Sequence, residues 1–184
     1  MNKKTDLSKY TTGNFSVNAG VLKQVLWYFT NVLFFLNPFN PISSLKVGLL
    51  RVFGAKVGKG VNIKPAVNIK YPWKLEIGDF SWIGENAWID NLDQVTIGKH
   101  CCISQGAMLL CGNHNFKTPG FDLMVKPIVL EDGAWVGAHA VVAPGIICRS
   151  HSVLAVNSVA TKNLNEYSIY QGNPAIKVKD RIIE

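Results

Sequence analysis

The stretch IGDFSWIGENAWIDNLDQVTIG, residues 77–98, restarts its own pattern after six, six and then eight residues, each time with an isoleucine that is often followed by glycine. The same period runs through most of the chain, and thirteen of its fifteen lead positions hold Val, Ile or Leu. These lead positions are Val57, Ile63, Ile69, Ile77, Ile83, Ile89, Ile97, Ile103, Leu109, Leu130, Val136, Val142, Cys148, Leu154 and Ala160. Self-similarity at a fixed period predicts a solenoid, in which each repeat buries its apolar residue against the next repeat.

The spacing of the lead residues predicts the cross-section of this solenoid. Ile77 follows Val57 by twenty residues and precedes Ile97 by twenty, whereas Leu130 and Cys148 are eighteen residues apart. Each coil therefore consists of three hexapeptides, with two extra residues at one corner of the first coils. We expect a triangular prism whose three sides are parallel strands and whose lead residues form aliphatic ladders inside.

The segments outside the repeat are expected to cover the prism. Residues 21–36 are too short and too polar to span a bilayer, so they predict a helix packed on the protein or a neighbouring subunit, or one touching the inner membrane face. The expected organisation is an N-terminal tail and apolar helical cap in residues 1–56, and the prism in residues 57–162 with a protruding loop at about 115–127. A C-terminal tail in residues 163–184 then packs on the prism, turned back by Gly172, Asn173 and Pro174.

The composition restricts the classes of binding partner and the cellular compartment that are expected for this chain. The formal net charge of +7 suits a phosphate-bearing partner, but the scattered basic residues lack the stripe of a nucleic-acid surface, so no nucleic acid is expected. The cysteines form no CxxC pair and follow no secretory leader, which predicts a reduced, cytoplasmic protein; they are Cys101, Cys102, Cys111 and Cys148. Neighbours such as His100 and Cys101 point to opposite faces of an extended segment, so no metal site is expected.

Several motifs carry a resemblance to a known family. They are the repeats, EDGAWVGAHAVVAPG at residues 131–145, NSVATKN at 157–163 and YQGNPA at 170–175. Together they resemble the hexapeptide-repeat acyltransferases, which implies an all-β solenoid with the left-handed parallel β-helix of that family, against the usual right-handed crossover. The chain looks like the galactoside, maltose and serine acetyltransferase branch. It looks most like the colanic acid biosynthesis acetyltransferases of exopolysaccharide pathways, through residues 49–60, 69–98 and 102–114.

The resemblance implies an acetyl-CoA-dependent O-acetyltransferase that acts on a sugar hydroxyl of an exopolysaccharide precursor. In that branch a loop beginning at a histidine interrupts the repeat, and here His114 precedes the excursion. Histidine exchanges a proton near neutral pH, so the resemblance assigns His114 as the general base. The alternative is a surface histidine at a turn. Close relatives commonly carry aspartate after the histidine, where this chain has Asn115.

The resemblance also implies a set of binding residues. Contacts with acetyl-CoA are expected from Trp135, Gly137, Ala138, Val156, Thr161, Lys162 and Lys179. Among them, Trp135 would flank the pantetheine arm, the N–H groups after it would face the thioester, and Lys162 would meet phosphate. Candidates near the acceptor or the histidine are Asp93, Asn115 and Asp122, with Glu85 as a further carboxylate that could orient the ring.

Other assignments remain open at this stage. His100, His139 and His151 each occupy the fourth position of a hexapeptide, where a solvated residue is expected, and His139 is the next candidate for a contact. The acceptor could instead be a free sugar, serine or an amino sugar, and the chain could be a non-catalytic β-helix scaffold. A γ-type carbonic anhydrase needs three convergent histidines, which this spacing disfavours. The family implies a homotrimer with each site between two prisms.

Overall fold

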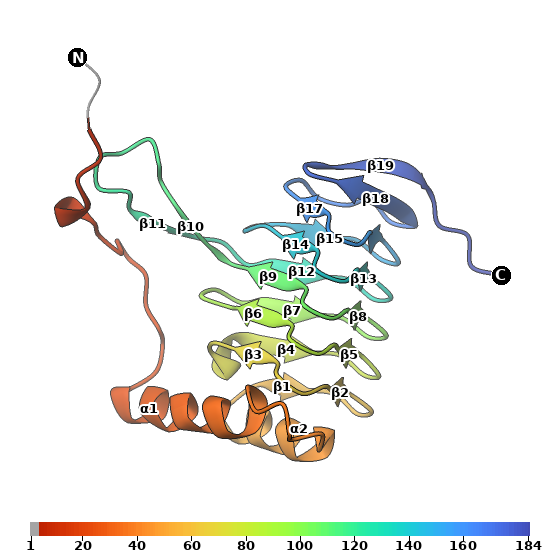
Figure 1. The fold of residues 1–184 in the computed structure, drawn as a ribbon, viewed down its shortest axis with the longest axis horizontal. Helices are drawn as coiled ribbons and strands as arrows, with labels where there is room; N and C mark the ends of the chain where they lie inside the picture. The colour runs from red at the N-terminus through yellow and green to blue at the C-terminus, as the bar shows by residue number, and fades with distance from the viewer. Residues whose placement is uncertain (1–3) are drawn as a thin grey trace.

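The computed structural model describes residues 4–184, which form a stack of triangular coils with helices at one end (Figure 1). Wall A consists of β1 (Lys56–Val57), β4 (Leu75–Ile77), β7 (Val95–Ile97), β12 (Ile128–Leu130) and β15 (Ile147–Cys148). Wall B consists of β2 (Asn62–Ile63), β5 (Trp82–Ile83), β8 (Cys102–Ile103), β13 (Trp135–Val136), β16 (Val153–Leu154), β18 (Ser168–Gly172) and β19 (Ala175–Asp180). Wall C consists of β3 (Asn68–Ile69), β6 (Trp88–Asp90), β9 (Met108–Leu110), β14 (Val141–Val142) and β17 (Val159–Ala160).

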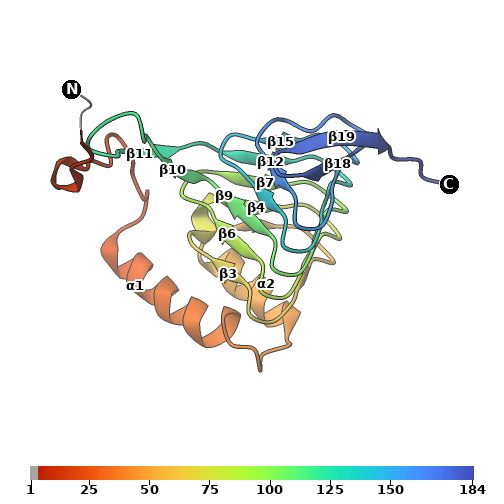
Figure 2. The same ribbon diagram turned by 45° about the horizontal axis from the view of Figure 1, so that its top comes forward.

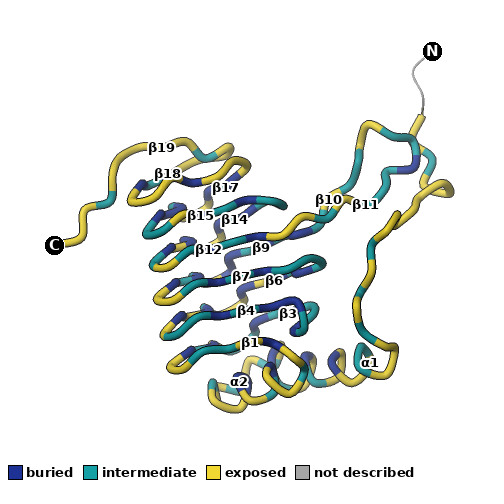
Figure 3. Tube along the Cα trace, turned by 180° about the vertical axis from the view of Figure 1, so that it is seen from behind, coloured by how far each residue is buried: buried dark blue, intermediate teal, exposed yellow. Residues whose placement is uncertain are grey.

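The lead residues stack one above another inside the prism. In wall A, Val57 pairs in parallel with Ile77, Ile77 with Ile97, and Ile97 with Leu130. Most of these side chains are completely buried, and the buried positions line the inside of the coils (Figure 3). Each buried aliphatic side chain contributes roughly 1.5–3 kcal/mol. The parallel β-helix predicted from the six-residue period is confirmed.

The fourth residue of the hexapeptide turns most corners with a left-handed backbone. Residues in this conformation include Phe80, Asn86, His100, His139 and His151, with φ between 54° and 58°. The histidine rings also pack on neighbouring coils: His100 stacks on Phe80 with ring centroids 5.4 Å apart, and an added Cβ on Gly106 would lie 2.4 Å from the His139 ring. His100 and His139 are exposed, as the sequence predicted, and their rings in addition contact the neighbouring coil.

Two helical segments close the first coil. They are α1 (Val21–Thr30), continued by the π-helical turn η2 (Asn31–Phe35), and α2 (Ser43–Val52). The buried Trp27 donates its indole N–H to the Ile69 carbonyl at 2.9 Å, and the buried Lys46 donates Nζ to the Lys64 carbonyl at 2.8 Å. The predicted cap is confirmed. In the described residues 4–184, none of the helices has the length and apolar character needed to cross a bilayer.

The C-terminal strands complete the last coil before the chain reverses. Leu164 bridges in parallel to Cys148, and β18 pairs in parallel with β16. Coil stacking therefore continues beyond residue 162, where the sequence placed the end of the prism. After the turn, β19 pairs antiparallel with β18, with Gly172 opposite Ala175, as the turn chemistry predicted.

A hairpin leaves the prism at the corner between walls C and A. Its strands, β10 (Gly112–His114) and β11 (Leu123–Val125), pair antiparallel. At its base the Lys126 N–H donates to the Cys111 carbonyl at 3.0 Å. The excursion thus begins at Gly112, three residues before the expected loop, and His114 lies on the hairpin itself. The same corner holds the extra residues of the first coil, as the turn η3 (Pro72–Lys74).

Three of the four thiols should resist alkylation in the folded protein. Burial raises the pKa of Cys101 to about 11 and those of Cys111 and Cys148 to about 12. The thiolate is the reactive form, and a two-unit rise leaves about a hundredfold less of it at pH 8. We expect iodoacetamide to label the half-exposed Cys102 alone, as read by peptide mass spectrometry. All four should react in urea, and native labelling of Cys148 as fast as Cys102 would contradict this.

Candidate functional site

The hairpin holds the His114 ring in one orientation. His114 Nδ1 lies 2.9 Å from the Phe121 carbonyl oxygen. Because a carbonyl can only accept a hydrogen bond, Nδ1 carries the proton, and Nε2 of the neutral ring keeps its lone pair. The Phe121 ring stacks on the imidazole, with centroids 4.6 Å apart and planes 8° apart. The arrangement presents a proton acceptor whose tautomer is set by backbone geometry.

The N-terminal segment supports the tip of this hairpin. We term residues 4–20 the strap; it runs from α1 to the hairpin along one side of the prism (Figure 2). The Asp6 N–H donates to the Pro119 carbonyl at 2.8 Å, and the Leu123 N–H donates to the Thr11 carbonyl at 3.1 Å. The Tyr10 ring lies 5.9 Å from the His114 ring. The strap and hairpin therefore form one unit around the imidazole.

The two polar candidates on the hairpin bind the hairpin and the strap. The Asp122 carboxylate accepts from the Thr11 N–H at 3.1 Å and from the Thr118 hydroxyl at 3.3 Å. Asn115 donates its N–H to the Asp122 carbonyl at 2.8 Å, and its side-chain oxygen accepts from the Lys117 N–H at 3.2 Å. The carboxylate of Asp122 thus anchors the tip. The group that orients His114 is a carbonyl and none of the carboxylates considered from sequence.

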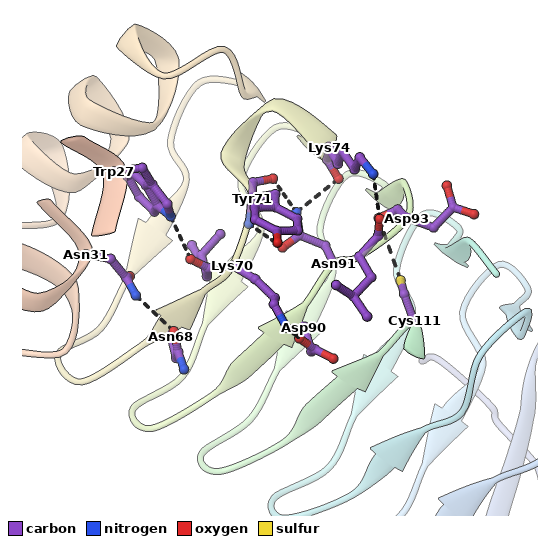
Figure 4. A network of polar contacts seen from close by, with 12 residues as sticks. Trp27, Asn31, Asn68, Lys70, Tyr71, Lys74, Asp90, Asn91, Asp93 and Cys111 are labelled. Atoms are coloured by element: carbon purple, nitrogen blue, oxygen red, sulfur yellow. Dashed lines mark hydrogen bonds and ion pairs between the residues drawn. The ribbon is translucent and has the colours of Figure 1, made fainter. Parts of the chain in front are cut away.

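A buried polar network stiffens the corner beneath the hairpin (Figure 4). The side-chain oxygen of the fully buried Asn91 accepts from the Tyr71 N–H at 2.9 Å, and its amide donates to the Lys74 carbonyl at 3.1 Å. Lys74 Nζ donates to the Leu92 carbonyl at 2.6 Å and to the Ser16 carbonyl of the strap at 2.7 Å. Burial lowers the pKa of Lys74, partly offset by the charge of Asp93. Satisfied buried groups of this kind fix a unique local structure.

A polar cavity of about 450 Å³ lies between the strap, this corner and the hairpin. It is lined by residues 12–16, Asn18, Lys74, Leu92, Asp93, Leu123 and Val125. Of the acceptor candidates, Asp93 is the one that lines it. His114 does not line the cavity, but it pairs across the hairpin with Leu123, which does. Glu85 lies at the corner between walls B and C, away from His114.

One group of predicted acetyl-CoA contacts lies on wall B and at the corner that follows it. Trp135 is 45% exposed and donates its indole N–H to the Ser104 hydroxyl at 2.9 Å. The Gly137 N–H donates to the Leu154 carbonyl at 2.8 Å, so it is unavailable to an oxyanion, contrary to the role expected for it. Within residues 4–184, the Ala138 N–H has no hydrogen-bond partner. Val156 lies at the same corner, one coil further on.

The remaining predicted contacts lie elsewhere. Thr161 and Lys162 are exposed and follow β17, at the corner between walls C and A from which the hairpin leaves. Lys179 lies exposed on β19. One protomer therefore brings His114, Asp93 and Lys162 to one corner, and Trp135 to a different wall. The described part of the chain, residues 4–184, contains no group of three His, Cys, Asp or Glu side chains placed to hold a metal ion.

Sequence reasoning missed the partners of the histidine. The Phe121 carbonyl and the strap residues Tyr10 and Thr11 were not singled out. Pro119 and Gly120 indicate a turn in the loop, but they do not show which carbonyl the turn directs at His114. No periodic pattern connects the strap to residues more than one hundred positions away. The left-handed backbone of Phe121, with φ of 55°, has no signature in a non-glycine residue.

Comparisons with known proteins agree with the architecture. "Putative colanic acid biosynthesis acetyltransferase WcaF" from Escherichia coli K12 is 33% identical over 177 residues, covering 96% of this chain and 97% of that protein. The hexapeptide-repeat acetyltransferase VCA0836 from Vibrio cholerae superimposes with a TM-score of 0.79 at 21% identity, covering 88% and 92% of the two chains. Galactoside acetyltransferase, solved in complex with coenzyme A, gives a TM-score of 0.76 at 22% identity, covering 86% and 80%.

No family model matches the chain. The relationship to WcaF extends over nearly the whole length of both proteins, and the resemblance seen in the repeats is confirmed. The chain belongs to the hexapeptide-repeat acetyltransferases, alongside the colanic acid biosynthesis acetyltransferase WcaF.

Proposed function

We propose that this acetyltransferase moves an acetyl group from acetyl-CoA to a saccharide hydroxyl of an exopolysaccharide precursor, with His114 as the general base. The observation that supports this proposal most strongly is the contact between His114 Nδ1 and the Phe121 carbonyl at 2.9 Å. It leaves Nε2 as the proton acceptor, and an alcohol needs such a base to become a nucleophile at neutral pH.

His114 returns to its starting protonation state within one catalytic cycle. Nε2 takes the proton of the acceptor hydroxyl as its oxygen forms a bond to the thioester carbonyl carbon. The tetrahedral intermediate then collapses, the carbon–sulfur bond breaks, and the departing thiolate receives the proton from Nε2. The acetyl ester, free coenzyme A and neutral histidine result. The fixed tautomer supports this shuttle because the same nitrogen accepts and returns the proton.

Acetyl-CoA as donor is supported by the structural neighbours. VCA0836 was solved with acetyl coenzyme A and galactoside acetyltransferase with coenzyme A. In this chain, Trp135, Ala138 and Val156 would hold the donor, and Thr161, Lys162 and Lys179 would meet its phosphates. Since Trp135 lies on wall B and His114 on the hairpin at the corner between walls C and A, a site between two prisms would unite them. This separation supports a homotrimer with shared sites.

A saccharide acceptor is supported by the relationship to WcaF and by the cavity beneath the hairpin. The cavity offers the Asp93 carboxylate and the Lys74 ammonium, with backbone groups of the strap around them. Such a mixture of donors and acceptors suits a neutral polyhydroxyl compound. A reaction in the reducing cytoplasm is supported by acetyl-CoA as the donor and by the four free cysteines.

The proposal predicts acceptor-dependent release of thiol from acetyl-CoA. Purified protein should be assayed with exopolysaccharide fragments, lipid-linked saccharides, free galactosides and maltose, serine and amino sugars. We expect turnover with a saccharide, and a product whose acetyl group is removed by mild alkali, because an ester hydrolyses where an amide survives. Turnover confined to amino sugars with an alkali-stable product would replace O-acetylation by N-acetylation. Failure to bind acetyl-CoA would overturn the proposal.

A further inference from the structure

The α1–η2 segment is apolar on two opposite sides. Trp27, Asn31 and Phe35 lie on its inward-facing side and pack against the prism. On the outer side, Leu22, Leu26, Phe29 and Leu33 recur at helical spacing, and each is more than half exposed. A helix that is apolar on both sides normally has apolar material on both. Within the described chain nothing covers the outer stripe.

The exposed apolar residues concentrate at this end of the molecule. Of the 27 large hydrophobic side chains that are exposed in residues 4–184, 13 lie in residues 21–52. Phe39, in the turn between η2 and α2, is 90% exposed, and Val52 at the end of α2 is 80% exposed. Figure 3 shows exposed positions recurring along both helices at this end. Clusters of this size mark contacts with another apolar phase or another protein.

The charge of the chain is divided between its two ends. Residues 1–75 hold eleven Lys and Arg against one Asp, whereas residues 76–184 hold eight Lys and Arg against eleven Asp and Glu. No carboxylate side chain occurs between Asp6 and Glu76. Within residues 1–75, residues 4–75 form the strap, the helical cap and nearly all of the first coil. Eight of these eleven cations lie in residues 21–75, at the same end as the exposed apolar stripe, and two of the eight, Lys46 and Lys74, are buried.

Two of these cations are free to meet an external anion. Lys59 and Lys64 are exposed, and neither forms an ion pair within the described residues. Arg51 is also exposed, but its guanidinium donates to the Val57 and Gly58 carbonyls at 2.8–3.1 Å. Lys59 and Lys64 lie at two corners of the first coil, on which α2 packs. Lys56, by contrast, pairs with Glu76 at 2.6 Å.

We infer that the helical end of the prism docks on the surface of an anionic phospholipid bilayer. The outer stripe of α1 enters the boundary between headgroups and acyl chains, and the cations of the first coil meet the lipid phosphates. A second copy of the chain could cover the apolar stripe, but it would bring the same excess of positive charge to that end. An anionic bilayer satisfies both features. The inference does not rest on the acceptor or on His114.

Vesicle flotation of the full-length protein tests this inference. The protein should float with vesicles of phosphatidylglycerol and phosphatidylcholine, remain unbound with phosphatidylcholine alone, and dissociate as salt rises to about 0.5 M. Leu22→Gln with Leu26→Gln should weaken binding about tenfold or more. Lys59→Gln with Lys64→Gln should weaken it about thirtyfold. The control pair Ile176→Gln with Ile182→Gln removes exposed apolar residues from the opposite end and should leave binding unchanged.

Size-exclusion chromatography with light scattering, on the same proteins, identifies the competing occupant. If Leu22→Gln with Leu26→Gln dissociates the oligomer while vesicle binding stays at the wild-type level, the stripe is a subunit interface and the inference fails. Equal binding to neutral and anionic vesicles would overturn the role of charge. No binding to either would overturn the docking surface itself. Thiol release measured in detergent-free buffer reports separately on acetyl transfer.

Discussion

Replacing His114 with alanine is expected to lower kcat for acetyl transfer by about 10²–10⁴-fold while KM for acetyl-CoA changes little. The physical reason is that the hydroxyl loses its proton acceptor and the thiolate loses its proton donor, whereas the donor contacts lie elsewhere. The measurement is thiol release under saturating acetyl-CoA and the acceptor identified by the panel. A large rise in KM with unchanged kcat would instead make His114 a binding residue.

The matched control for this variant is His100→Asn. His100 lies in a coil and not on the hairpin, and it occupies a left-handed corner position; Asn86 and Asn157 occupy equivalent positions in other coils. Asparagine therefore fits the backbone, and only the stacking on Phe80 is lost. Activity close to wild type is expected for His100→Asn. The unfolding midpoint of His114→Ala should match that of the wild type, because its imidazole is only partly buried and accounts for one side-chain hydrogen bond.

Replacing Gly78 with alanine is expected to destabilise the fold by about 1–3 kcal/mol or more. A Cβ at Gly78 would lie 2.5 Å from the Gly98 carbonyl carbon and 2.6 Å from the Lys99 nitrogen of the next coil. These are backbone atoms of a hydrogen-bonded corner, so no side-chain rotation relieves the clash. The coils must separate locally, which also weakens the bond from the Gly78 N–H to the Ile97 carbonyl. Urea unfolding at a fixed protein concentration measures the change.

Gly48→Ala is the same substitution at another position, and it is expected to have the opposite effect on the free energy of unfolding. Gly48 lies in α2, and an added Cβ there meets no atom within 4 Å. Alanine in a helix interior is favoured over glycine by about 0.5–1 kcal/mol, so this variant should be more stable than wild type. If Gly78→Ala were as stable as Gly48→Ala, the close contact between successive coils at that corner would be refuted.

The periodic part of the fold could be predicted because its energetics are local and repeated. The side chains of Ile77 and Ile97 are buried in the same way in successive coils. The same sequence pattern therefore indicates the same local structure in every coil. The cap was predictable from the apolar residues that an open coil must cover. His114 could be found because the repeat stops there. The position of Asp93 beside the hairpin also follows, since it occupies the same corner one coil earlier.

The contacts that hold the histidine could not be predicted, because they are unique and not repeated. The Phe121 carbonyl faces His114 as a result of hairpin geometry, which depends on one left-handed residue. The strap reaches Pro119 and Leu123 through backbone hydrogen bonds, which carry no residue preference. Likewise, the Gly137 N–H donates to the Leu154 carbonyl of the next coil, and a glycine in the sequence does not indicate that hydrogen bond.

The length of the strap also limits the number of coils between the helical cap and the hairpin. It is anchored at one end by α1 under the first coil and at the other by the hairpin that leaves the third. Adding a coil between them would raise the hairpin by about 4.8 Å, which is the reach of one or two extended residues. Insertions of a whole coil below the hairpin must therefore be matched by one or two residues in the strap, whereas coils added above it need no such compensation. A change in the number of coils is therefore tolerated more easily on the C-terminal side of His114, because it requires no matching change in the strap.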